Sequence, residues 1–268
     1  MRYGLLSDVH ANRQALESAM EFLSRQRVDA VLCAGDLVGA GAAPDACVRD
    51  VISEAAGCVA GNHDLAVLGE LPDARLSPQA WSSVAWTRTQ LSPESWDRLS
   101  ALPLVLRGPD GVMVAHGSLD DPQRYVQTGE EAHGQLARLA AEGPEWRILV
   151  LGHTHQPLAA GERSGIVLDG GEGTVRLRPG ERWLINPGSV GQAREWRVYA
   201  RIAILDLGRA TVSFRGLRYD TAGCRRELRR HGLDPSSCHL RPQPSQIALG
   251  RLRRVASRGV RAIRRRSM

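Results

Sequence analysis

The sequence predicts an α/β fold with two β-sheets and a small helical insertion. Over the first 60 residues, short apolar runs alternate with amphipathic stretches, which is typical of parallel βαβ units. Residues 65–100 then carry Trp and Pro in a helical pattern. After Gly143, short apolar runs follow one another with Gly- and Pro-containing turns between them, which indicates a further sheet.

The first elements are predicted in the order strand, helix, strand, helix, strand. The strands are expected at 3–6, 28–33 and 58–60, and the helices at 11–26 and 44–55. The connections between them are short. Because short connections keep consecutive elements adjacent, we expect parallel strands with the helices packed on the sheet.

The insertion at 65–100 has its own composition. It contains three Trp and three Pro, at Trp81, Trp86, Trp96, Pro72, Pro78 and Pro93. Trp81, Val84 and Ala85 have the spacing of one helix face. These aromatic residues could pack on the main domain, or the insertion could form a cap that shapes the substrate pocket. The sequence leaves both interpretations open.

The remaining strands are expected at apolar runs in the second half of the chain. They are 112–115, 148–151, 165–168, 174–177, 182–185, 199–205 and 211–215. The turns Asp169-Gly170-Gly171, Pro179-Gly180 and Leu207-Gly208 separate the later runs. Gly-containing turns between short strands are typical of hairpins, so we expect these strands to pair with their neighbours in sequence.

Five of the predicted strands are followed by residues that can bind a metal ion. These residues are Asp8, His10, Asp36, Asn62, His63, Asp64, His116, His153 and His155. The carboxyl ends of the strands in an open α/β sheet meet at one edge, where ligands bind. We therefore expect these residues to converge there.

Carboxylate, imidazole and amide groups suit divalent Mn, Fe, Zn, Ni or Mg, and no Cys belongs to the set. Two such ions roughly 3.5 to 4 Å apart can share one carboxylate and clamp both oxygens of a phosphoryl displacement. Asp36 is the expected bridge. The pattern predicts a hydrolytic site with two metals.

The series Asp-x-His, Gly-Asp, Gly-Asn-His-Asp, Ala-His-Gly and Gly-His-Thr-His resembles the calcineurin-like metallophosphoesterases. It is closest in pattern to the bacterial branch related to phosphodiesterases and diadenosine tetraphosphatases. The resemblance extends over about residues 1–232. It implies two stacked mixed sheets flanked by helices, an αββα sandwich.

The resemblance also implies a role for each site residue. One metal would be held by Asp8, His10, Asp36 and His155, and the other by Asp36, Asn62, His116 and His153. His63 would be the acid near the leaving group, and Asp64 would orient it. The residues themselves leave another interpretation of Asp64, which could cap the helix expected to begin near Leu65.

Three further details bear on the substrate. The loop Asn186-Pro187-Gly188-Ser189 could lie near the metals, as in similar proteins, or be a plain turn. The loop at 39–44 has no aromatic residue, and Asp120 stands where related proteins commonly carry Arg. A carboxylate there would repel an anionic substrate. His133, His231 and His239 are expected at the surface.

The expected function is a dinuclear metal-dependent phosphoesterase that hydrolyses a phosphodiester by attack of a metal-bridging hydroxide. Hydrolysis of a phosphomonoester or a dinucleoside polyphosphate is the alternative. A second alternative is a noncatalytic scaffold that binds a phosphorylated ligand. The expected cofactors are two divalent ions, manganese first, with Fe, Ni, Zn or Mg as alternatives, and the expected substrate is a phosphorylated small molecule or nucleotide.

The composition excludes several other mechanisms. All 35 basic residues are Arg, because the chain contains no Lys. A phosphate-binding loop that ends in Gly-Lys-Ser/Thr is therefore excluded. A Schiff-base mechanism is excluded too, because it needs a lysine amine. A two-metal mechanism needs no lysine.

The cysteines and the hydrophobicity of the chain predict a cytoplasmic protein. The five Cys form an odd set without Cys-x-x-Cys spacing, which favours reduced thiols. The N-terminus begins directly with a predicted strand, and no segment approaches the roughly 18 to 20 apolar residues that span a bilayer. Neither secretion nor a membrane span is expected.

We expect two regions along the chain. Residues 1–235 form the metallophosphoesterase catalytic domain, with 65–100 as a cap-like insertion, and 236–268 form an Arg-rich C-terminal tail. From Arg241 to Met268 there are nine Arg and no acidic residue, so the preceding residues sum to +6 − 9 = −3. The tail could form a basic amphipathic helix on an anionic membrane, a nucleic acid or a partner protein, or remain solvated.

Overall fold

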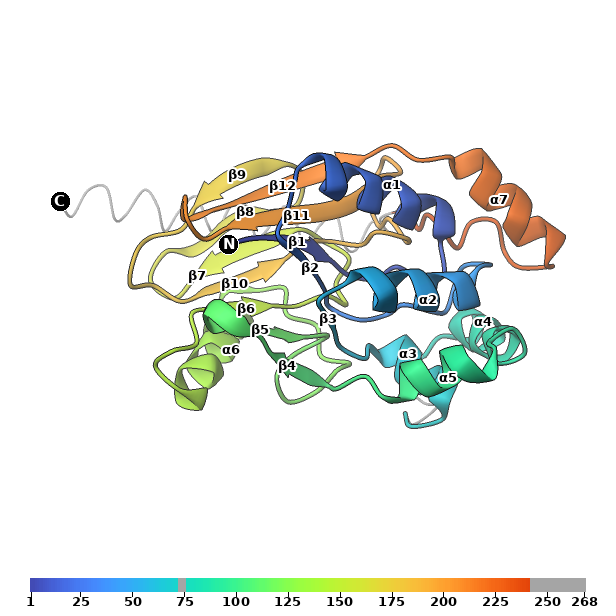
Figure 1. Ribbon diagram of the computed structural model, residues 1–268, viewed down its shortest axis with the longest axis horizontal. Coiled ribbons are helices and arrows are strands. Elements are labelled where there is room, and N and C mark those ends of the chain that lie inside the picture. The colour runs from blue at the N-terminus through green and yellow to red at the C-terminus, as the bar shows by residue number, and fades with distance from the viewer. Residues whose placement is uncertain (72–75, 242–268) are drawn as a thin grey trace.

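Two mixed six-stranded β-sheets lie face to face at the centre of the structure, with helices on their outer sides (Figure 1). The computed structural model describes residues 1–71 and 76–241. This architecture confirms the predicted sandwich of two sheets with a small helical insertion.

The first sheet combines the N-terminal and C-terminal strands. Its order is β3 (Gly57–Cys58), β2 (Ala30–Cys33), β1 (Arg2–Leu6), β11 (Ala200–Asp206), β12 (Thr211–Leu217) and β9 (Gly173–Arg176). The first three strands are parallel, and β11 pairs with β1 in antiparallel orientation. Helices α1 (Arg13–Arg25) and α2 (Pro44–Glu54) connect the parallel strands, and their buried side chains cover the outer face of this sheet.

The second sheet is built from the middle of the chain. Its order is β4 (Val105–Arg107), β5 (Val112–Ala115), β6 (Ile148–Val150), β10 (Trp183–Asn186), β7 (Leu158–Gly161) and β8 (Gly165–Asp169). A short 3₁₀ turn, Pro109–Gly111, precedes β5. Helix α6 (Gly129–Glu142) covers the outer face, where Leu136 and Leu139 pack against Met113 and Leu149.

Strand β1 is buried on both of its faces, which explains its continuous apolar sequence. Tyr3 and Leu5 point into the core between the sheets, where they belong to one buried cluster with Val114 and Ile185. Leu6 belongs to the cluster under α1 and α2. Because successive side chains of a strand alternate between faces, a strand buried on both sides has a continuous apolar run.

The assignment of strands to sheets differs from the prediction. The strands after residue 143 do not form a sheet of their own. Instead β9, β11 and β12 extend the first sheet, whereas β6, β7, β8 and β10 belong to the second. The reason is long-range pairing: β11 pairs with β1, while β10 pairs with β6.

Two of the three predicted hairpins are wrong for the same reason. The turns at 169–171 and 179–180 lead from one sheet to the other, because β8 pairs with β7 and β9 pairs with β12. Leu207-Gly208 does join a hairpin, β11 with β12. Strand β7 was missed because Ala and Gly are poor strand formers. It forms because β10 and β8 pair on either side of it.

The insertion contains α3 (Asn62–Leu68), α4 (Pro78–Arg88) and α5 (Pro93–Ser100). Ser77 and Ser92 cap α4 and α5, each followed by Pro at the first helical position. Trp81 and Trp96 pack against the buried cluster under α1 and α2. The packing interpretation of the aromatic residues is therefore right for these two, and α4 also lines the pocket described below.

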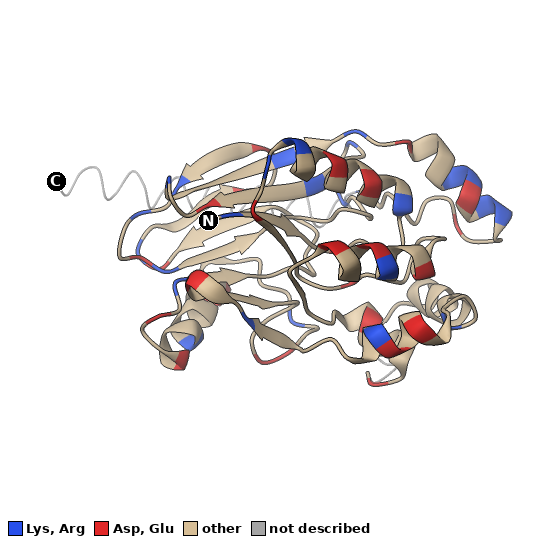
Figure 2. Ribbon diagram, in the orientation of Figure 1, with Lys and Arg blue, Asp and Glu red and all other residues tan. Residues whose placement is uncertain are grey.

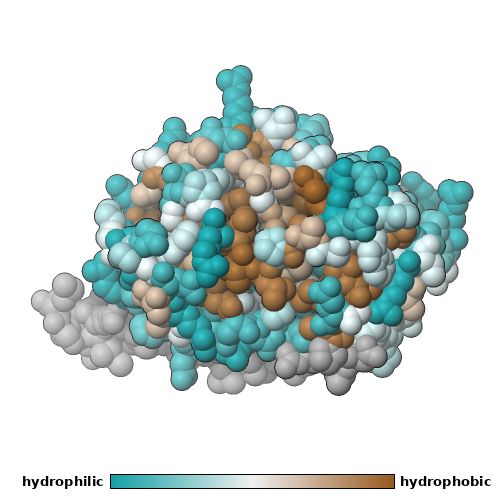
Figure 3. All heavy atoms as spheres, turned by 60° about the horizontal axis from the view of Figure 1, so that its bottom comes forward, coloured by the Kyte–Doolittle hydropathy of each residue, from teal (hydrophilic) through white to brown (hydrophobic). Residues whose placement is uncertain are grey.

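The side of the molecule at the bottom of Figure 1 carries α3, α5, β4 and α6. Figure 3 shows that apolar side chains gather at the centre of this face, with hydrophilic ones around them. Leu104, directly before β4, is 52% exposed. Strand β4 is an edge strand of the second sheet.

Helix α7 (Thr221–Arg230) packs on α1 and carries four arginines (Figure 2). The chain then returns to the body of the protein. Ser237 Oγ donates to Ala40 O at 2.9 Å, and Leu240 N donates to Ala193 O at 2.9 Å. The folded part thus extends past the predicted boundary at residue 235. The rest of the predicted tail, 242–268, lies outside the described residues.

All five cysteines are free and buried. Within residues 1–71 and 76–241, no helix combines the length and the apolar character that crossing a membrane requires.

Candidate metal centre

The residues predicted to bind metals meet at one edge of the sandwich. They follow β1, β2 and β3 of the first sheet and β5 and β6 of the second, so the site lies where the two sheets adjoin. A direct contact between the sheets fixes this junction, because His153 N donates to both carboxylate oxygens of Asp8 at 3.2 and 3.1 Å. The site therefore draws on both sheets and not on one.

The backbone of these residues is unusual. Five of them have positive φ: Asp8 at 54°, His10 at 47°, Asp36 at 56°, His153 at 65° and His155 at 61°. For residues other than Gly this conformation costs roughly 1 to 2 kcal/mol each. Such strain concentrates at functional sites, where the surrounding structure holds it.

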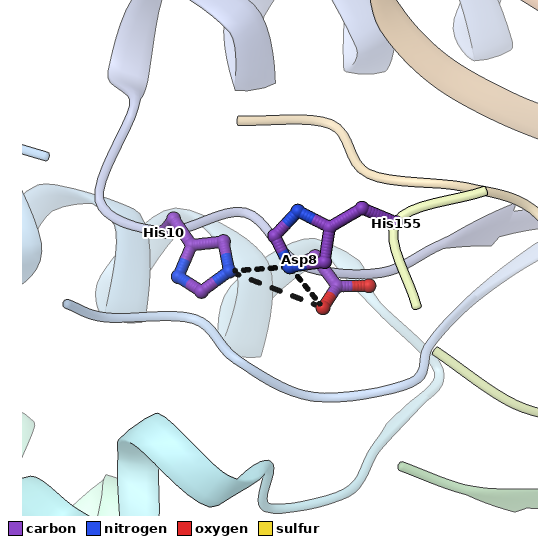
Figure 4. A group of neighbouring side chains, drawn as sticks. All are labelled: Asp8, His10 and His155. Atoms are coloured by element: carbon purple, nitrogen blue, oxygen red, sulfur yellow. Dashed lines mark hydrogen bonds and ion pairs between the residues drawn. The ribbon is translucent and has the colours of Figure 1, made fainter. Parts of the chain in front are cut away.

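Asp8, His10 and His155 form the first group of donors (Figure 4). His155 Nε2 lies 3.2 Å from Asp8 Oδ1 and 3.1 Å from His10 Nε2. One donor atom from each residue lies within 4.8 Å of the others. All three side chains are buried.

Asp36, His116 and His153 form a second group with the same spacing. His116 Nε2 lies 3.4 Å from Asp36 Oδ2 and 3.0 Å from Asn62 Oδ1. The two groups touch at Asp36, because its Oδ2 is also 3.6 Å from His10 Nε2. Asp36 therefore lies within reach of both donor groups.

Three of the imidazole rings contact a backbone carbonyl through one nitrogen, which leaves the other nitrogen of each ring facing the centre. His116 Nδ1 lies 2.6 Å from Ala34 O, and His155 Nδ1 lies 2.7 Å from Gln192 O. His153 Nε2 lies 3.1 Å from Gln123 O. A ring N–H that donates to a carbonyl leaves the other nitrogen as a lone-pair donor, which is the usual arrangement of metal-binding histidines. The donor set thus fits divalent metal ions.

The charges at the centre also favour cations. Burial would raise the pKa of Asp8 and Asp36, but the neighbouring His155 and His116 hold each pKa below its ordinary value. Burial would lower the pKa of His116, yet Asp36 and Asp8 raise it to about 10. Burial and the charge of His116 lower the pKa of His153 to about 3. A site that retains a proton between two buried carboxylates can exchange it for a metal ion.

His63 lies at the edge of the centre and lines the pocket. Its ring meets that of His10 edge-on, with centroids 4.8 Å apart. Its Nδ1 is buried and has no hydrogen-bond partner among the described residues. Burial lowers the pKa of His63, and the positive charge of Arg194 acts in the same direction. Both effects disfavour the protonated form of the imidazole.

Asp64 takes part in the N-terminal cap of α3. Its carboxylate accepts hydrogen bonds from Gly61 N at 2.9 Å and Val38 N at 3.1 Å. Burial and the nearby Asp36 raise the pKa of Asp64 to about 7. These contacts agree with the capping interpretation, and the role of Asp64 in orienting His63 stays a prediction.

Gly39 is a site residue that the sequence analysis missed. Its φ is +86°, and an added Cβ would lie 2.5 Å from His63 Nδ1. The residue must therefore be small for His63 to take its position. The sequence signal that could have identified Gly39 is its position shortly after Gly35-Asp36.

The loop after β10 supports the centre from behind. Asn186 Nδ2 donates to Gly152 O at 2.5 Å and to Thr154 Oγ1 at 3.0 Å. Ser189 Oγ donates to Asp8 O at 2.9 Å. Of the two interpretations of this loop, proximity to the centre is therefore correct.

Asp120 does not present a free charge to a substrate. Its Oδ2 lies 3.2 Å from both Arg124 and Arg138. These cations and the hydrogen bonds from Ser118 and Gln135 outweigh burial and lower its pKa. The two arginines offset the charge of Asp120, and the repulsion of an anionic substrate by this carboxylate stays a prediction.

A cavity of about 1460 Å³ opens over the centre. Its floor includes Asp36, Asn62, His63, His153 and His155, and its walls come from α4, the 121–125 loop, α7 and residues 232–241. His239 belongs to this wall and contacts Glu195 O at 2.7 Å, so it is not a plain surface residue. His133 and His231 are exposed, as expected.

Comparison with known proteins agrees with this geometry. Residues 1–209 match the model of the calcineurin-like phosphoesterase superfamily domain. A metallophosphoesterase from Sphaerobacter thermophilus is 31% identical, with a TM-score of 0.76 over 89% of this chain and 97% of that one. A hypothetical protein from Pyrococcus horikoshii, at 17% identity and a TM-score of 0.70 over 88% of this chain and 96% of its own, shares the fold.

An uncharacterized protein from Methanocaldococcus jannaschii is 27% identical over 220 residues, which are 81% of this chain and 87% of that protein. The family match spans every residue of the two donor groups. The chain therefore belongs to the calcineurin-like phosphoesterase superfamily, whose members are metal-dependent phosphoester hydrolases.

Proposed function

We propose that the protein hydrolyses phosphodiesters with two divalent metal ions. The observation that carries this proposal is the position of Asp36, whose Oδ2 lies 3.6 Å from His10 Nε2 and 3.4 Å from His116 Nε2. One ion would be held by Asp8, His10, Asp36 and His155. The other would be held by Asp36, Asn62, His116 and His153.

Two bound ions would polarise the phosphoryl oxygens and supply hydroxide near neutral pH. The chain itself fixes the donors through the carbonyls behind His116 and His155. His63 is the group that faces the pocket beside the donors, with a nitrogen that the described residues leave unpaired. We assign it the transfer of a proton, or a hydrogen bond, to the departing oxygen.

The size of the pocket supports a diester. Typical ligand sites have roughly 300 to 1,000 Å³, and this cavity, at about 1460 Å³, has room for organic groups on both sides of a phosphate. A phosphomonoester or a dinucleoside polyphosphate is the alternative substrate. A noncatalytic phosphate-binding scaffold is less consistent with a complete donor set. Manganese is the proposed metal, with Fe, Ni, Zn or Mg as alternatives.

Metal analysis tests the dinuclear proposal. The saturated protein should hold two ions per chain, and Asp36→Asn should weaken both sites because its carboxylate is shared. His10→Ala should mainly empty one. Asp120→Asn is the matched control, because this carboxylate pairs with arginines outside the donor groups. One ion at saturation, or full occupancy and activity in Asp36→Asn, would contradict the proposal.

The substrate is tested with a panel of phosphodiesters, phosphomonoesters and dinucleoside polyphosphates, each assayed with Mn, Mg, Ni and Zn. We expect the highest kcat/KM for a diester. A higher kcat/KM for a phosphomonoester would favour the alternative function, hydrolysis of a phosphomonoester. Binding of these compounds without turnover in the metal-loaded protein would support the scaffold.

A further inference from the structure

Arg194 lies in the same pocket as the metal donors. It lines the cavity together with His63, His153 and His155. The residue follows β10 in the loop that also supports Asp8.

The guanidinium of Arg194 has only neutral partners within the described parts of the chain. It donates to Tyr125 Oη and to Gln192 Oε1, both at 3.3 Å. Its Nε is buried and has no acceptor. A buried donor without an acceptor is costly, and Arg194 itself is half-buried.

Two other arginines of this protein, the buried Arg201 and the exposed Arg88, show what a structural role looks like. Arg201 binds Glu195 through Nε at 2.6 Å and through a second nitrogen at 2.5 Å. Arg88 donates from Nε to Val67 O at 2.8 Å and from a second nitrogen to Ala66 O at 2.7 Å. In both cases Nε has an acceptor within the protein. The Nε atoms of Arg2 and Arg182 also lack a hydrogen-bond partner, but each of these arginines lies in an ion pair with a carboxylate. Arg194 combines an unpaired Nε with neutral partners only among the described residues.

The position of Arg194 is fixed relative to the metal donors. Gln192 holds the guanidinium with its side-chain oxygen, and its backbone carbonyl holds His155 Nδ1 at 2.7 Å. The side-chain nitrogen of Gln192 donates to Ser237 O at 2.9 Å. Gln192 therefore connects Arg194, the metal donor His155 and the wall of the pocket at Ser237.

We infer that Arg194 is a substrate-binding residue whose guanidinium binds oxygens of the phosphoryl group that reaches the metal centre. The planar guanidinium offers parallel N–H donors that match the oxygens of a phosphate, and its pairing with an oxyanion supplies both the missing acceptor and the missing counter-charge. Arg124, the cation of the 121–125 wall, is already paired with Asp120. The inference rests on the proposed phosphoesterase function.

The test uses the full-length, metal-loaded protein and the variants Arg194→Gln and Arg194→Lys. Arg197→Gln is the matched control, because Arg197 is exposed, lies three residues further on and contacts Tyr199 outside the pocket. Three quantities are measured: metal content, the affinity for inorganic phosphate by calorimetry, and kcat/KM for bis-p-nitrophenyl phosphate. Activity is also measured with added guanidinium ion.

Arg194→Gln should keep both metals and weaken phosphate binding by roughly ten- to a hundredfold, as expected for the loss of a charged hydrogen bond. The value of kcat/KM should fall by a similar factor. Arg194→Lys should retain part of the affinity, and free guanidinium should restore part of the activity of Arg194→Gln. The control should match the wild type in all three measurements.

Unchanged phosphate affinity in Arg194→Gln would overturn the inference. So would a loss of affinity that is accompanied by loss of metal, because that outcome assigns Arg194 a structural role. If the wild type hydrolyses no diester, the proposed function fails, but phosphate calorimetry still decides whether Arg194 binds the anion.

Discussion

Backbone strain in this protein coincides with the metal donors. Among the described residues other than Gly, ten have positive φ, and five of them belong to the donor groups. Local propensity disfavours these conformations. They are held by long-range contacts, such as the hydrogen bonds from His153 N to Asp8. Tertiary structure therefore sets the donor geometry.

Gly39 offers a test of this geometry that touches no donor. We expect Gly39→Ala to lower kcat, because a Cβ would lie 2.5 Å from His63 Nδ1 and displace that ring. A displacement of about 1 Å at a reacting group can cost up to about 100-fold in rate. Gly180→Ala is the matched control, since Gly180 also has positive φ, at +68°, but has open space around it. Equal kcat in the two variants would disprove steric positioning of His63.

His63→Ala should retain both metals and slow the hydrolysis of esters with poor leaving groups. Activated nitrophenyl esters should be affected less, because a nitrophenolate leaves without protonation. General acid catalysis contributes on the order of 10² to 10⁴ in rate. The measurement is kcat for a series of leaving groups, with metal content determined in parallel. Equal slowing across the series would assign His63 to phosphate binding instead of proton transfer.

At the scale of secondary-structure elements, one carboxylate fastens the insertion to the main body. Asp45, in the first turn of α2, accepts hydrogen bonds from Ser92 Oγ at 2.7 Å and Ser92 N at 2.9 Å, and Ser92 is the N-cap of α5. Burial would raise the pKa of Asp45. The hydrogen bonds from Ser92 and the charge of Arg49 outweigh burial and lower it to about 2.

This contact predicts a pH-dependent stability. Because the folded pKa of Asp45 lies below its ordinary value of 3.8, the ionised carboxylate stabilises the fold above about pH 4, and this contribution is lost as the pH falls towards 2. Asp45→Asn should lower the free energy of unfolding by about 1 to 2 kcal/mol at pH 7. The difference from the wild type should shrink below pH 4.

Urea denaturation of the metal-free proteins at pH 7, 4 and 3 measures this difference. Glu54→Gln is the control, because Glu54 is exposed at the other end of the same helix. A difference between Asp45→Asn and the wild type that does not vary with pH would show that the charge of Asp45 does not hold α5.

At the scale of the whole molecule, the C-terminal part of the described chain completes the pocket. The superfamily domain matches residues 1–209, whereas α7 and residues 232–241 lie beyond it and line the cavity. Ser237 and Leu240 bind the loops around Ala40 and Ala193. We therefore expect two truncations to behave differently.

A chain that ends after Arg241 should hydrolyse small diesters with nearly wild-type kcat/KM, because it retains the pocket wall. A chain that ends after Gly232 lacks the wall and should show a higher KM. Metal content should be the same in both, because the donor residues end at His155. Equal KM values for the two chains would show that the wall does not contact the substrate.

The partner expected for the Arg-rich tail remains a prediction, since residues 242–268 lie outside the described structure. If the nine arginines from Arg241 onward bind an anionic surface, the full-length protein should bind anionic vesicles or RNA, and the chain ending at Arg241 should not. Raising the salt from roughly 50 to 200 mM should weaken binding. Binding that is insensitive to salt or unaffected by truncation would contradict the electrostatic interpretation.

The sequence by itself determined the candidate donor residues and the order of the elements that carry them. Metal ions bind only a few residue types, which restricts the candidate donors. These residues directly follow apolar runs, so a short stretch of sequence is enough to identify them. The strands at 112–115 and 165–168 and the helix at 44–55 were predicted within one residue for the same reason, since periodicity and turn residues act over short distances.

Only the tertiary structure decided which sheet each strand joins, what Asp64 binds and what surrounds His63. The pairing of β1 with β11 joins residues about 200 positions apart, and no local pattern encodes it. Asp64 binds Gly61 N and Val38 N, and Arg194 faces the pocket, because three separate loops meet there. Local sequence thus specifies donor chemistry, whereas long-range packing specifies the distances and charges that make those donors a site.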